Sequence, residues 1–297
     1  MILDTLASTY VSTFAADATD PVGRVALCAS WGANSVSDGS LGTWRHPPLA
    51  YVVAELAISP HYTLKAALPA LQNALRSDFP RTVEGTEFVI DPSSPPAVQP
   101  VWRLIAADQR RGVHLGSRSL SLHATAYDDS TDFLRRWKDV LTAISAAKLG
   151  AFVERAGLRY FDLIVPSPSH EPRDYLISTL HGLQPPSGGI VQNSFWGTAL
   201  LIDGFVVQAR TAAPAPQGMV LAPNLAAIPL EKSQVMVAAE KRTEAKQPVG
   251  FIDTDCLREV QQVFDPDSIL ALYSELHQRV SGVFKSLMSD LARSEWI

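Results

Sequence analysis

The segment 157–162 reads Gly-Leu-Arg-Tyr-Phe-Asp and places a guanidinium, a phenol and a carboxylate close together. On a β-strand, Arg159 points to one face while Tyr160 and Asp162 point to the other. The planar guanidinium of Arg159 can bind a carboxylate or phosphate through two parallel hydrogen bonds. Arg159, Tyr160 and Asp162 are therefore candidate ligand-binding residues. The alternative, which we favour for Arg159, is an internal ion pair with Asp162 or with an aspartate of segment 253–255.

Two carboxylates lie two positions apart in Asp253-Thr254-Asp255, so on a strand they share one face. Such a pair can bind a divalent cation or act as general acid and base. A metal site would need a third oxygen ligand from another part of the chain. The simpler interpretation, which we favour, is that Asp255 ends the strand and caps a turn over residues 256–260. Asp253 and Asp255 therefore remain only weak metal candidates.

The seven histidines show no His-x-His or His-Glu-x-x-His spacing, so the sequence predicts no zinc site. His123 stands in the middle of a strand pattern, where an imidazole in a cleft can act as a general base. A single histidine on a strand is more often structural, and we favour that role. His123 is kept as a fourth candidate ligand-binding residue.

A basic cluster occupies residues 101–118, where four arginines against Asp108 give a local charge of 4 − 1 = +3. A hairpin with this charge can contact a nucleic-acid backbone, and a tryptophan beside it can stack on a base. The candidate nucleic-acid-binding residues are Trp102, Arg103, Arg110, Arg111 and Arg118. The whole chain, however, has 25 basic and 30 acidic side chains, a net charge of −5. A dedicated nucleic-acid binder has a broader basic surface, so we favour a solvated hairpin.

The common hydrolase, nucleotide-triphosphatase and dinucleotide-binding fingerprints are absent from the sequence. The two cysteines, Cys28 and Cys256, form neither a disulfide framework nor a metal cluster. With 46% hydrophobic and 19% charged residues among 297, the chain can bury a core and is not disordered as a whole. We expect no catalytic residue and no cofactor.

Residues 1–45 form a predicted appendage with a helix near 2–14 and a strand near 22–28. Its stretch 29–43 is small and polar and cannot bury much apolar area. We predict that this appendage is dispensable for folding; it is either a docking arm or has no role of its own. No basic, apolar leader begins the sequence, and no apolar run reaches the roughly 18 residues of a membrane span. We therefore expect a cytoplasmic protein without membrane contact.

Residues 46–150 form a first predicted unit with the order β-α-β-β-β-β-α. Apolar positions at helical spacing predict a helix over 62–77, and a second helix follows Ser130 or Thr131, its expected N-cap. Runs of β-formers and alternating patterns predict the strands. These strands cover residues 49–58, 83–90, 101–107, 111–115 and 118–126.

Residues 151–297 form a second predicted unit with a similar outline. A long strand over 152–165 is followed by a helix over 172–182. The closing helix over 267–290 has the clearest apolar stripe in the chain, and Asp265 before a proline supplies its N-cap. The remaining predicted strands cover residues 188–195, 198–209, 216–222, 233–240 and 249–255.

The chain thus contains β-α-β(4)-α about twice, which predicts an α+β fold of two similar units with antiparallel sheets and helices packed on one face. The similarity concerns elements only, so internal duplication is a hypothesis. The stripe of the closing helix predicts that Leu276, Val280 and Phe284 lie at a helix–sheet interface, because an exposed stripe would aggregate.

Six segments stand out together by their order and spacing: residues 48–60, 102–104, 119–127, 153–162, 252–255 and 276–284. In these segments the chain resembles a sporadically distributed, uncharacterised bacterial protein family, matched over about residues 46–297. The family has no assigned activity, so the resemblance implies no catalytic motif. Its scattered occurrence implies accessory genes in bacterial defence or on mobile elements. The family often has threonine at the position of His123, so His123 is not a ligand that the family shares.

These features favour a non-enzymatic binding or accessory subunit that self-associates or docks a protein partner. The resemblance adds a bacterial defence or mobile-element setting. The alternative is an RNA- or nucleotide-directed protein, either a binder or a metal-independent endonuclease, that uses the hairpin 101–118 and His123. A third hypothesis is a metal-dependent enzyme centred on Asp253 and Asp255.

Overall fold

The computed structural model describes most of the chain from Trp44 to Ile297, and these residues belong to one compact unit. The helix predicted near 2–14 and the strand predicted near 22–28 lie outside the described residues. The described residues are 44, 46–60, 63–89, 97–149, 152–183, 185–187, 189–216 and 228–297.

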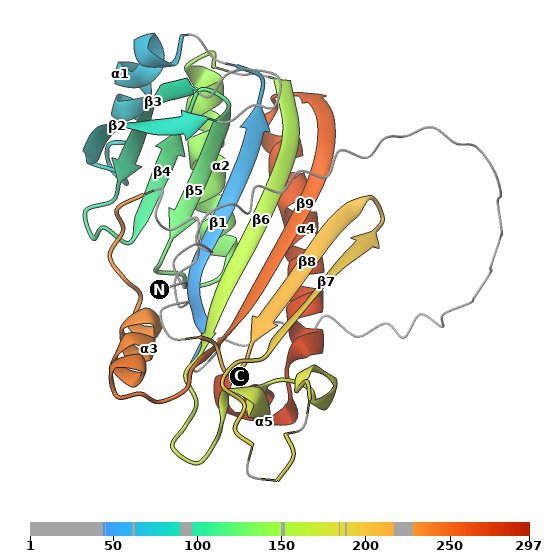
Figure 1. The fold of residues 1–297 in the computed structure, drawn as a ribbon. Helices are drawn as coiled ribbons and strands as arrows, with labels where there is room; N and C mark the ends of the chain where they lie inside the picture. Colours follow the sequence, from blue (N-terminus) through green and yellow to red (C-terminus); the bar gives the residue numbers. More distant parts are fainter. Residues whose placement is uncertain are drawn as a thin grey trace, which may run out of the picture. The chain divides into compact units, whose positions relative to one another are not determined.

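The first half of the described chain forms five strands and two helices close to the predicted positions (Figure 1). In chain order these are β1 (Leu49–Ile58), α1 (Leu64–Leu75), β2 (Arg81–Val89), β3 (Ala97–Ile105), β4 (Arg111–Leu115), β5 (Ser119–Ala124) and α2 (Ser130–Ala146). The N-cap predicted for α2 is wrong by one residue, because the carboxylate of Asp129 accepts the hydrogen bond from the Asp132 N–H.

The second half differs more from the prediction. Its elements are β6 (Phe152–Ile164), the 3₁₀ turns η1 (Pro172–Tyr175) and η2 (Ser178–Leu180), β7 (Phe195–Ile202), β8 (Phe205–Ala212), α3 (Gln234–Glu244), β9 (Gly250–Val263), α4 (Pro266–Leu287) and α5 (Asp290–Trp296). The long strand predicted over 152–165 is confirmed. The helix predicted over 172–182 is wrong, because Leu176 pairs with Met288 and the Ile177 N–H donates to the Leu287 carbonyl.

Two further predicted strands differ from the structure. The strand predicted over 198–209 is interrupted by Asp203-Gly204, which forms the two-residue turn between β7 and β8. Both turn residues have positive φ, 51° and 80°, as a type I′ turn requires. The strand predicted over 233–240 is helix α3, whose first turn is capped by the Ser233 hydroxyl accepting from the Met236 N–H.

The other strands predicted in this half shift or fall outside the described residues. Among the described residues of 188–195 only Phe195 belongs to a strand. All of 216–222 except Pro216 lies outside the described residues. The strand predicted over 249–255 continues to Val263 as β9, so the predicted turn over 256–260 is wrong.

The closing helix is two helices. Asp265 caps α4, as predicted, by accepting from the Ser268 N–H. Met288 then adopts an extended conformation, and the Ser289 hydroxyl caps α5 by accepting from the Ala292 N–H. The predicted single helix over 267–290 therefore ends where Met288 pairs with Leu176. None of the described helices is both long and apolar enough to cross a membrane.

All nine strands of the described chain form one antiparallel sheet with the order β2-β3-β4-β5-β1-β6-β9-β8-β7. Strands β1 and β6 pair near its centre and join the two predicted halves. The α+β class is confirmed, whereas the prediction of separate sheets is wrong. The pairing of β1 with β6 joins the segments on either side of the predicted boundary between residues 150 and 151.

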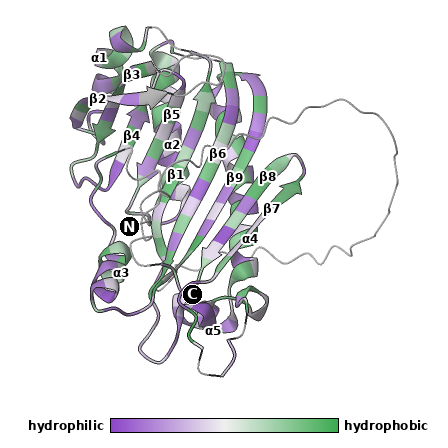
Figure 2. Ribbon diagram, in the orientation of Figure 1, coloured by the Kyte–Doolittle hydropathy of each residue, from purple (hydrophilic) through white to green (hydrophobic). Residues whose placement is uncertain are grey.

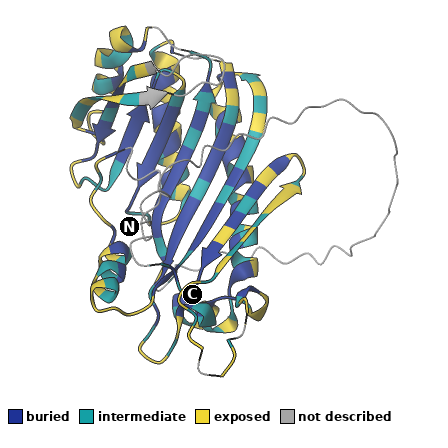
Figure 3. Cartoon of the chain, viewed as in Figure 1, coloured by how far each residue is buried: buried dark blue, intermediate teal, exposed yellow. Residues whose placement is uncertain are grey.

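Helices α1, α2 and α4 cover one side of this sheet, which we call the helix face; the other side is the open face. Trp137 of α2, Tyr273 of α4 and Leu71 of α1 are fully buried against the strands. Figure 3 shows the central strands as the most continuously buried part of the molecule. Helix α3 packs instead on the open face, where Met236 contacts the cluster around Tyr51. The prediction of helices on one face is therefore wrong for α3.

The N-terminal boundary of the folded unit lies before Trp44. The ring of Trp44 packs against Phe284, with 5.8 Å between the ring centroids, and the His46 N–H donates to the Trp296 carbonyl. Leu276 and Val280 lie in the main core as predicted, and Phe284 lies in a second cluster with Trp44 and Trp296. Since Trp44 belongs to this core, a truncation that tests the appendage has to start upstream of it.

Candidate functional site

One row of residues crosses the open face from β5 to β8. In register, His123 lies opposite Val53, Val53 opposite Arg159, Arg159 opposite Asp255, and Asp255 opposite Gln208. Figure 2 shows hydrophilic positions interrupting these central strands. Alternation along a strand places Asp253 on the same face. Several of the candidate residues identified from the sequence thus lie on one side of one sheet.

A groove of about 690 Å³ lies on this face over β6, β9, β8 and β7. Its floor includes Phe161 and Phe251, whose rings stack with 5.4 Å between centroids. Its outer wall is β7, where Phe195 is 55% exposed. Its charged groups are those of Arg159, Asp253 and Arg210. The groove therefore combines aromatic surface with fixed charges.

Arg159 and Asp253 form a bidentate ion pair across β6 and β9. The Nε and Nη2 atoms of Arg159 each lie 2.7 Å from one carboxylate oxygen of Asp253. The internal ion pair that we favoured for Arg159 is confirmed. A second cation, Arg210, lies 3.7 Å from the same carboxylate, and its side chain is 57% exposed. Two arginines and one aspartate thus give the groove a net charge of 2 − 1 = +1.

Asp255 is half-buried beside this pair. Burial raises the pKa of the Asp255 carboxyl to about 6; the charge of Arg159 opposes that rise, and the carboxylates of Asp253 and Glu55 add to it. The negative charge of Asp255 at neutral pH is therefore unfavourable in the folded protein.

We expect Asp255→Asn to raise the free energy of unfolding at pH 8 by on the order of 2 kcal/mol. The pKa of Asp255 is about 6 in the folded protein, whereas the ordinary value of 3.8 applies to the unfolded chain. Between pH 3.8 and 6, the folded state therefore binds more protons than the unfolded state. The wild-type free energy of unfolding therefore falls as the pH rises from 4 to 6, and the Asp255→Asn variant lacks this decrease. Urea denaturation at several pH values measures both effects.

The control for this prediction is Glu154→Gln, an exposed carboxylate of β6, which should keep the wild-type pH slope. If Asp255→Asn is less stable than wild type at every pH, the carboxylate is instead held charged by Arg159, and the prediction is wrong.

His123 lies at the centre of a buried hydrogen-bonded chain. The Tyr51 hydroxyl is 2.5 Å from its Nδ1 atom, and the Ser121 hydroxyl is 2.7 Å from its Nε2 atom. Burial, together with the charges of His114 and Arg103, lowers the pKa of His123 to about 3. The ring is therefore neutral at neutral pH, with one nitrogen donating and the other accepting.

This arrangement is unsuited to general-base catalysis. Both ring nitrogens of His123 are already bonded, and Ser121 and His123 are buried. With a pKa near 3, the imidazole is also too weak a base to take up a proton at neutral pH. His123 also lies two strands from Arg159, a separation of about 10 Å. Its contacts are those of a structural histidine that ties β1 to β5.

Tyr160 and Asp162 do not line the groove, because alternation turns them towards the helix face. The Tyr160 hydroxyl lies 3.0 Å from Nδ1 of His277 on α4 and 3.3 Å from the Tyr127 hydroxyl. Burial raises the pKa of both Tyr160 and Asp162, and the charge of Asp253 adds to the rise for Asp162. Of the four candidate ligand-binding residues, only Arg159 reaches the groove.

The hairpin 101–118 is β3 and β4, but it does not present a stacking ring. Trp102 is 4% exposed and belongs to the main core on the helix face, so its predicted role in stacking on a base is wrong. Arg103 lies on the other face opposite His114, and Arg111 forms an ion pair with Asp108 at 3.5 Å. The Asp108 carboxylate also accepts a hydrogen bond from the Arg110 N–H. Asp108 thus offsets part of the local positive charge.

Within the described chain, no group of three or more His, Cys, Asp or Glu side chains is placed to hold a metal ion. Asp253 instead gives both carboxylate oxygens to Arg159. Asp255 faces the same arginine across the β6–β9 pair. Asp253 thus belongs to an ion-pair network with Arg159 and Arg210.

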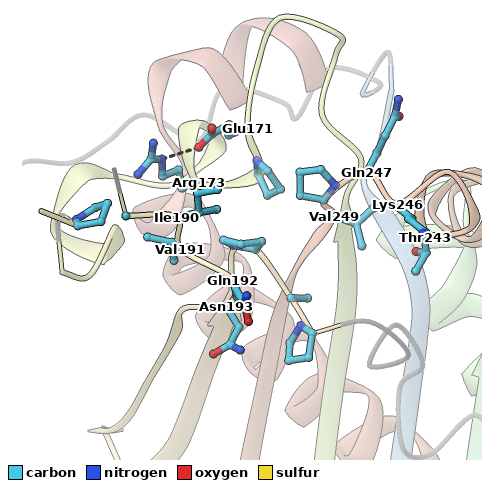
Figure 4. A pocket seen from close by; sticks show the side chains of 17 residues that line it. Glu171, Arg173, Ile190, Val191, Gln192, Asn193, Thr243, Lys246, Gln247 and Val249 are labelled. Atoms are coloured by element: carbon cyan, nitrogen blue, oxygen red, sulfur yellow. Dashed lines mark ion pairs between the residues drawn. The ribbon is translucent and has the colours of Figure 1, made fainter. Parts of the chain in front are cut away.

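A second cavity of about 710 Å³ lies among the loops at one end of the sheet (Figure 4). Its walls include five prolines, and its rim carries the ion pair between Glu171 and Arg173 at 2.9 Å. These two charges neutralise each other, and Lys246 supplies the remaining cation. The cavity lacks the exposed aromatic ring that accompanies the cation in the groove, so we take the groove as the candidate site.

Arg210, Phe195 and Tyr51 are not among the candidate residues predicted from the sequence. A signal for the first two was present, because Asp203-Gly204 between apolar runs is typical of a two-residue hairpin. That turn fixes the register in which Gly197 lies opposite Arg210. No local sequence pattern distinguishes Tyr51 from the other residues of a buried strand. Its contact with His123 depends on the pairing of β1 with β5.

Comparison of the chain with protein-family models and with curated proteins finds no match. The assignment of function therefore depends on the geometry of the groove.

Proposed function

We propose that this protein is a non-enzymatic binding subunit that docks a segment of a protein partner in the groove of the open face. The observation that carries the proposal is the exposed guanidinium of Arg210 beside the exposed ring of Phe195. Phe195 pairs with Ala212 and Gly197 with Arg210, so Phe195 and Arg210 are diagonal neighbours on one face. Gly197 adds no side chain above Arg210, which leaves the cation accessible.

The chemistry of these groups selects the ligand. An exposed arginine binds a carboxylate through charge-assisted hydrogen bonds, and an exposed phenylalanine packs against an apolar side chain. The pair Arg159–Asp253 beneath them is fixed and supplies a rigid floor. The proposed ligand is therefore a peptide segment with an acidic residue next to an apolar one.

Two features support binding without catalysis. The carboxylate of Asp253 is occupied by two arginines, and the imidazole of His123 is bonded at both nitrogens. Neither group is free to move a proton to or from a bound molecule. The resemblance noted above supports an accessory role in bacterial defence or on a mobile element.

Selection of peptides from a random display library on the immobilised protein tests this proposal. We expect selected peptides to carry Asp or Glu beside an apolar residue, and Arg210→Gln to weaken their binding about tenfold, as the loss of one charge-assisted contact predicts. Arg173→Gln, in the second cavity, is the matched control and should leave binding unchanged. Isothermal titration gives the dissociation constants.

Peptides without an acidic residue, or peptides that bind Arg210→Gln as tightly as wild type, would contradict the proposal. A titration with single-stranded RNA across salt concentrations tests the alternative. Binding to RNA that weakens steeply with salt would favour a nucleic-acid role instead.

We also propose that the two halves of the sheet arose by duplication. Outwards from the centre, β1 is followed by β5, β4, β3 and β2, and β6 is followed by β9, β8 and β7, so the first half has one strand more than the second. Each half thus starts with a long central strand, and the last strand of that half pairs beside it. This order of strands supports the duplication hypothesis.

A further inference from the structure

The two edges of the sheet are built differently. Edge strand β2 carries Arg81, Glu84 and Glu87, and such charges discourage pairing with another strand. Edge strand β7 reads Phe-Trp-Gly-Thr-Ala-Leu-Leu-Ile and has neither a charge nor a proline. Figure 1 shows β7 as the outermost strand on the side away from β2. An uncharged apolar edge of this length is a ready template for a further strand.

The large exposed side chains of β7 are apolar, and so is that of Val206 on β8. On β7, Leu201 is 77% and Leu200 40% exposed, in addition to Phe195. Val206, opposite Leu201 on β8, is 37% exposed. Grouped apolar exposure of this kind marks an interaction surface.

The register of the hairpin shows which backbone groups of β7 face outwards. The two-residue turn makes Ile202 and Phe205 a hydrogen-bonded pair, so bonding to β8 alternates from Ile202 back along β7. The N–H and C=O groups that point away from β8 are those of Phe195, Gly197, Ala199 and Leu201. No backbone hydrogen bond from a described residue reaches these groups.

From these observations we propose that the chain forms a two-fold homodimer in which β7 pairs antiparallel with β7 of a second copy. The inference deepens the proposed binding role by adding self-association, but it depends on the edge strand and not on the peptide ligand. A register centred on Thr198 brings the outward-facing residues together and forms about eight N–H···O bonds between the copies.

This register explains why a second copy is the partner. It places Phe195 opposite Leu201 and Gly197 opposite Ala199 of the other copy, so large side chains meet large ones and small meet small. On the helix face it places Trp196 opposite Leu200. No like charges meet across the dyad, because β7 has none. The strand is therefore complementary to itself in size and in charge.

The mass of the full chain in solution, measured by sedimentation velocity over a range of concentrations, tests the dimer. We expect a dimer for wild type and an at least tenfold weaker dimer, about 1.4 kcal/mol, for Leu201→Lys, which introduces a charge at the paired edge. Val263→Lys is the matched control, since Val263 is 76% exposed but lies on β9 away from both edges. A wild-type protein that stays monomeric, or a dimer unaffected by Leu201→Lys, overturns the proposal.

A cysteine substitution tests the register itself. Thr198→Cys should form a disulfide between copies on mild oxidation, because residues opposite each other in a non-hydrogen-bonded pair are about 4.5 Å apart between Cα atoms. Leu201→Cys should not, since its own counterpart lies about six residues along the other strand. Both variants carry Cys28→Ser to remove a background thiol; Cys256 is buried. A crosslink at Leu201 but not at Thr198 would overturn the register.

The tests of dimer and groove are separable. Leu201 does not line the groove, so a monomeric Leu201→Lys protein should still bind the selected peptides. If the dimer is absent while peptide binding persists, only the edge-strand inference fails. If the dimer forms and Arg210→Gln changes no binding, only the groove proposal fails.

Discussion

Replacing Phe284 by alanine is expected to lower the free energy of unfolding by about 3–5 kcal/mol. Phe284 is 8% exposed, and its ring centroid lies 5.8 Å from that of Trp44 and 6.4 Å from that of Trp296. These three rings join α4, α5 and the start of the folded unit. Truncation leaves a cavity that the two large rings cannot fill without moving, so both the lost burial and the cavity contribute. Denaturant unfolding followed by fluorescence measures the loss.

Phe152→Ala is the matched control for this prediction. Phe152 begins β6 and is 39% exposed, so the same truncation removes less buried surface and should cost less than half as much. Equal losses for the two variants would show that Phe284 is not a packing centre. A Phe284→Ala protein that keeps its stability but no longer self-associates would place the stripe of α4 in an interface instead.

Replacing Arg159 by leucine is expected to lower the free energy of unfolding by on the order of 3 kcal/mol, because the partner carboxylate is left buried and uncompensated. The side chains of Arg159 and Asp253 are 13% and 6% exposed, and both bonds between them are 2.7 Å long. Arg210, at 3.7 Å and mostly exposed, cannot replace a bidentate partner. Thermal and denaturant unfolding measure the loss.

A double-mutant cycle isolates the pair. Arg159→Leu with Asp253→Leu removes both charges beside Phe161 and Phe251, so the double variant should recover much of the stability lost by either single variant. Arg155→Leu is the control, since its contact with Glu55 is 3.7 Å long and exposed and should contribute less than about 1 kcal/mol. A fully stable Arg159→Leu protein that has lost only peptide binding would make Arg159 a ligand-binding residue.

Local features of the sequence determine a large part of this fold. Alternation along β6 separates Arg159 from Tyr160 and Asp162, because a strand has a period of two whatever surrounds it. Asp265 caps α4 because its carboxylate reaches the Ser268 N–H three residues away. The mix of helices and antiparallel strands follows from such short-range patterns, and with it the α+β class.

Elements with marginal local preferences were decided by distant partners. The segment 172–182 has helix-forming residues, but Leu176 pairs with Met288, and Met288 in turn ends α4. Segment 233–240 contains β-formers, yet it folds as a helix whose Met236 is buried against the open face. In both cases the free energy gained by tertiary burial and strand pairing exceeds the differences in local propensity, which are only tenths of a kcal/mol per residue.

Strand order and register determine which residues come together in the candidate site. The sequence left three aspartates as possible ion-pair partners of Arg159. Alternation directs Asp162 to the helix face, and the β6–β9 register places Asp253 and Asp255 beside Arg159. The order β6-β9-β8-β7 then adds Arg210 and Phe195, which lie more than 30 residues away in the chain. Register between strands is set by long-range pairing and by which face is buried, so no local pattern contains it.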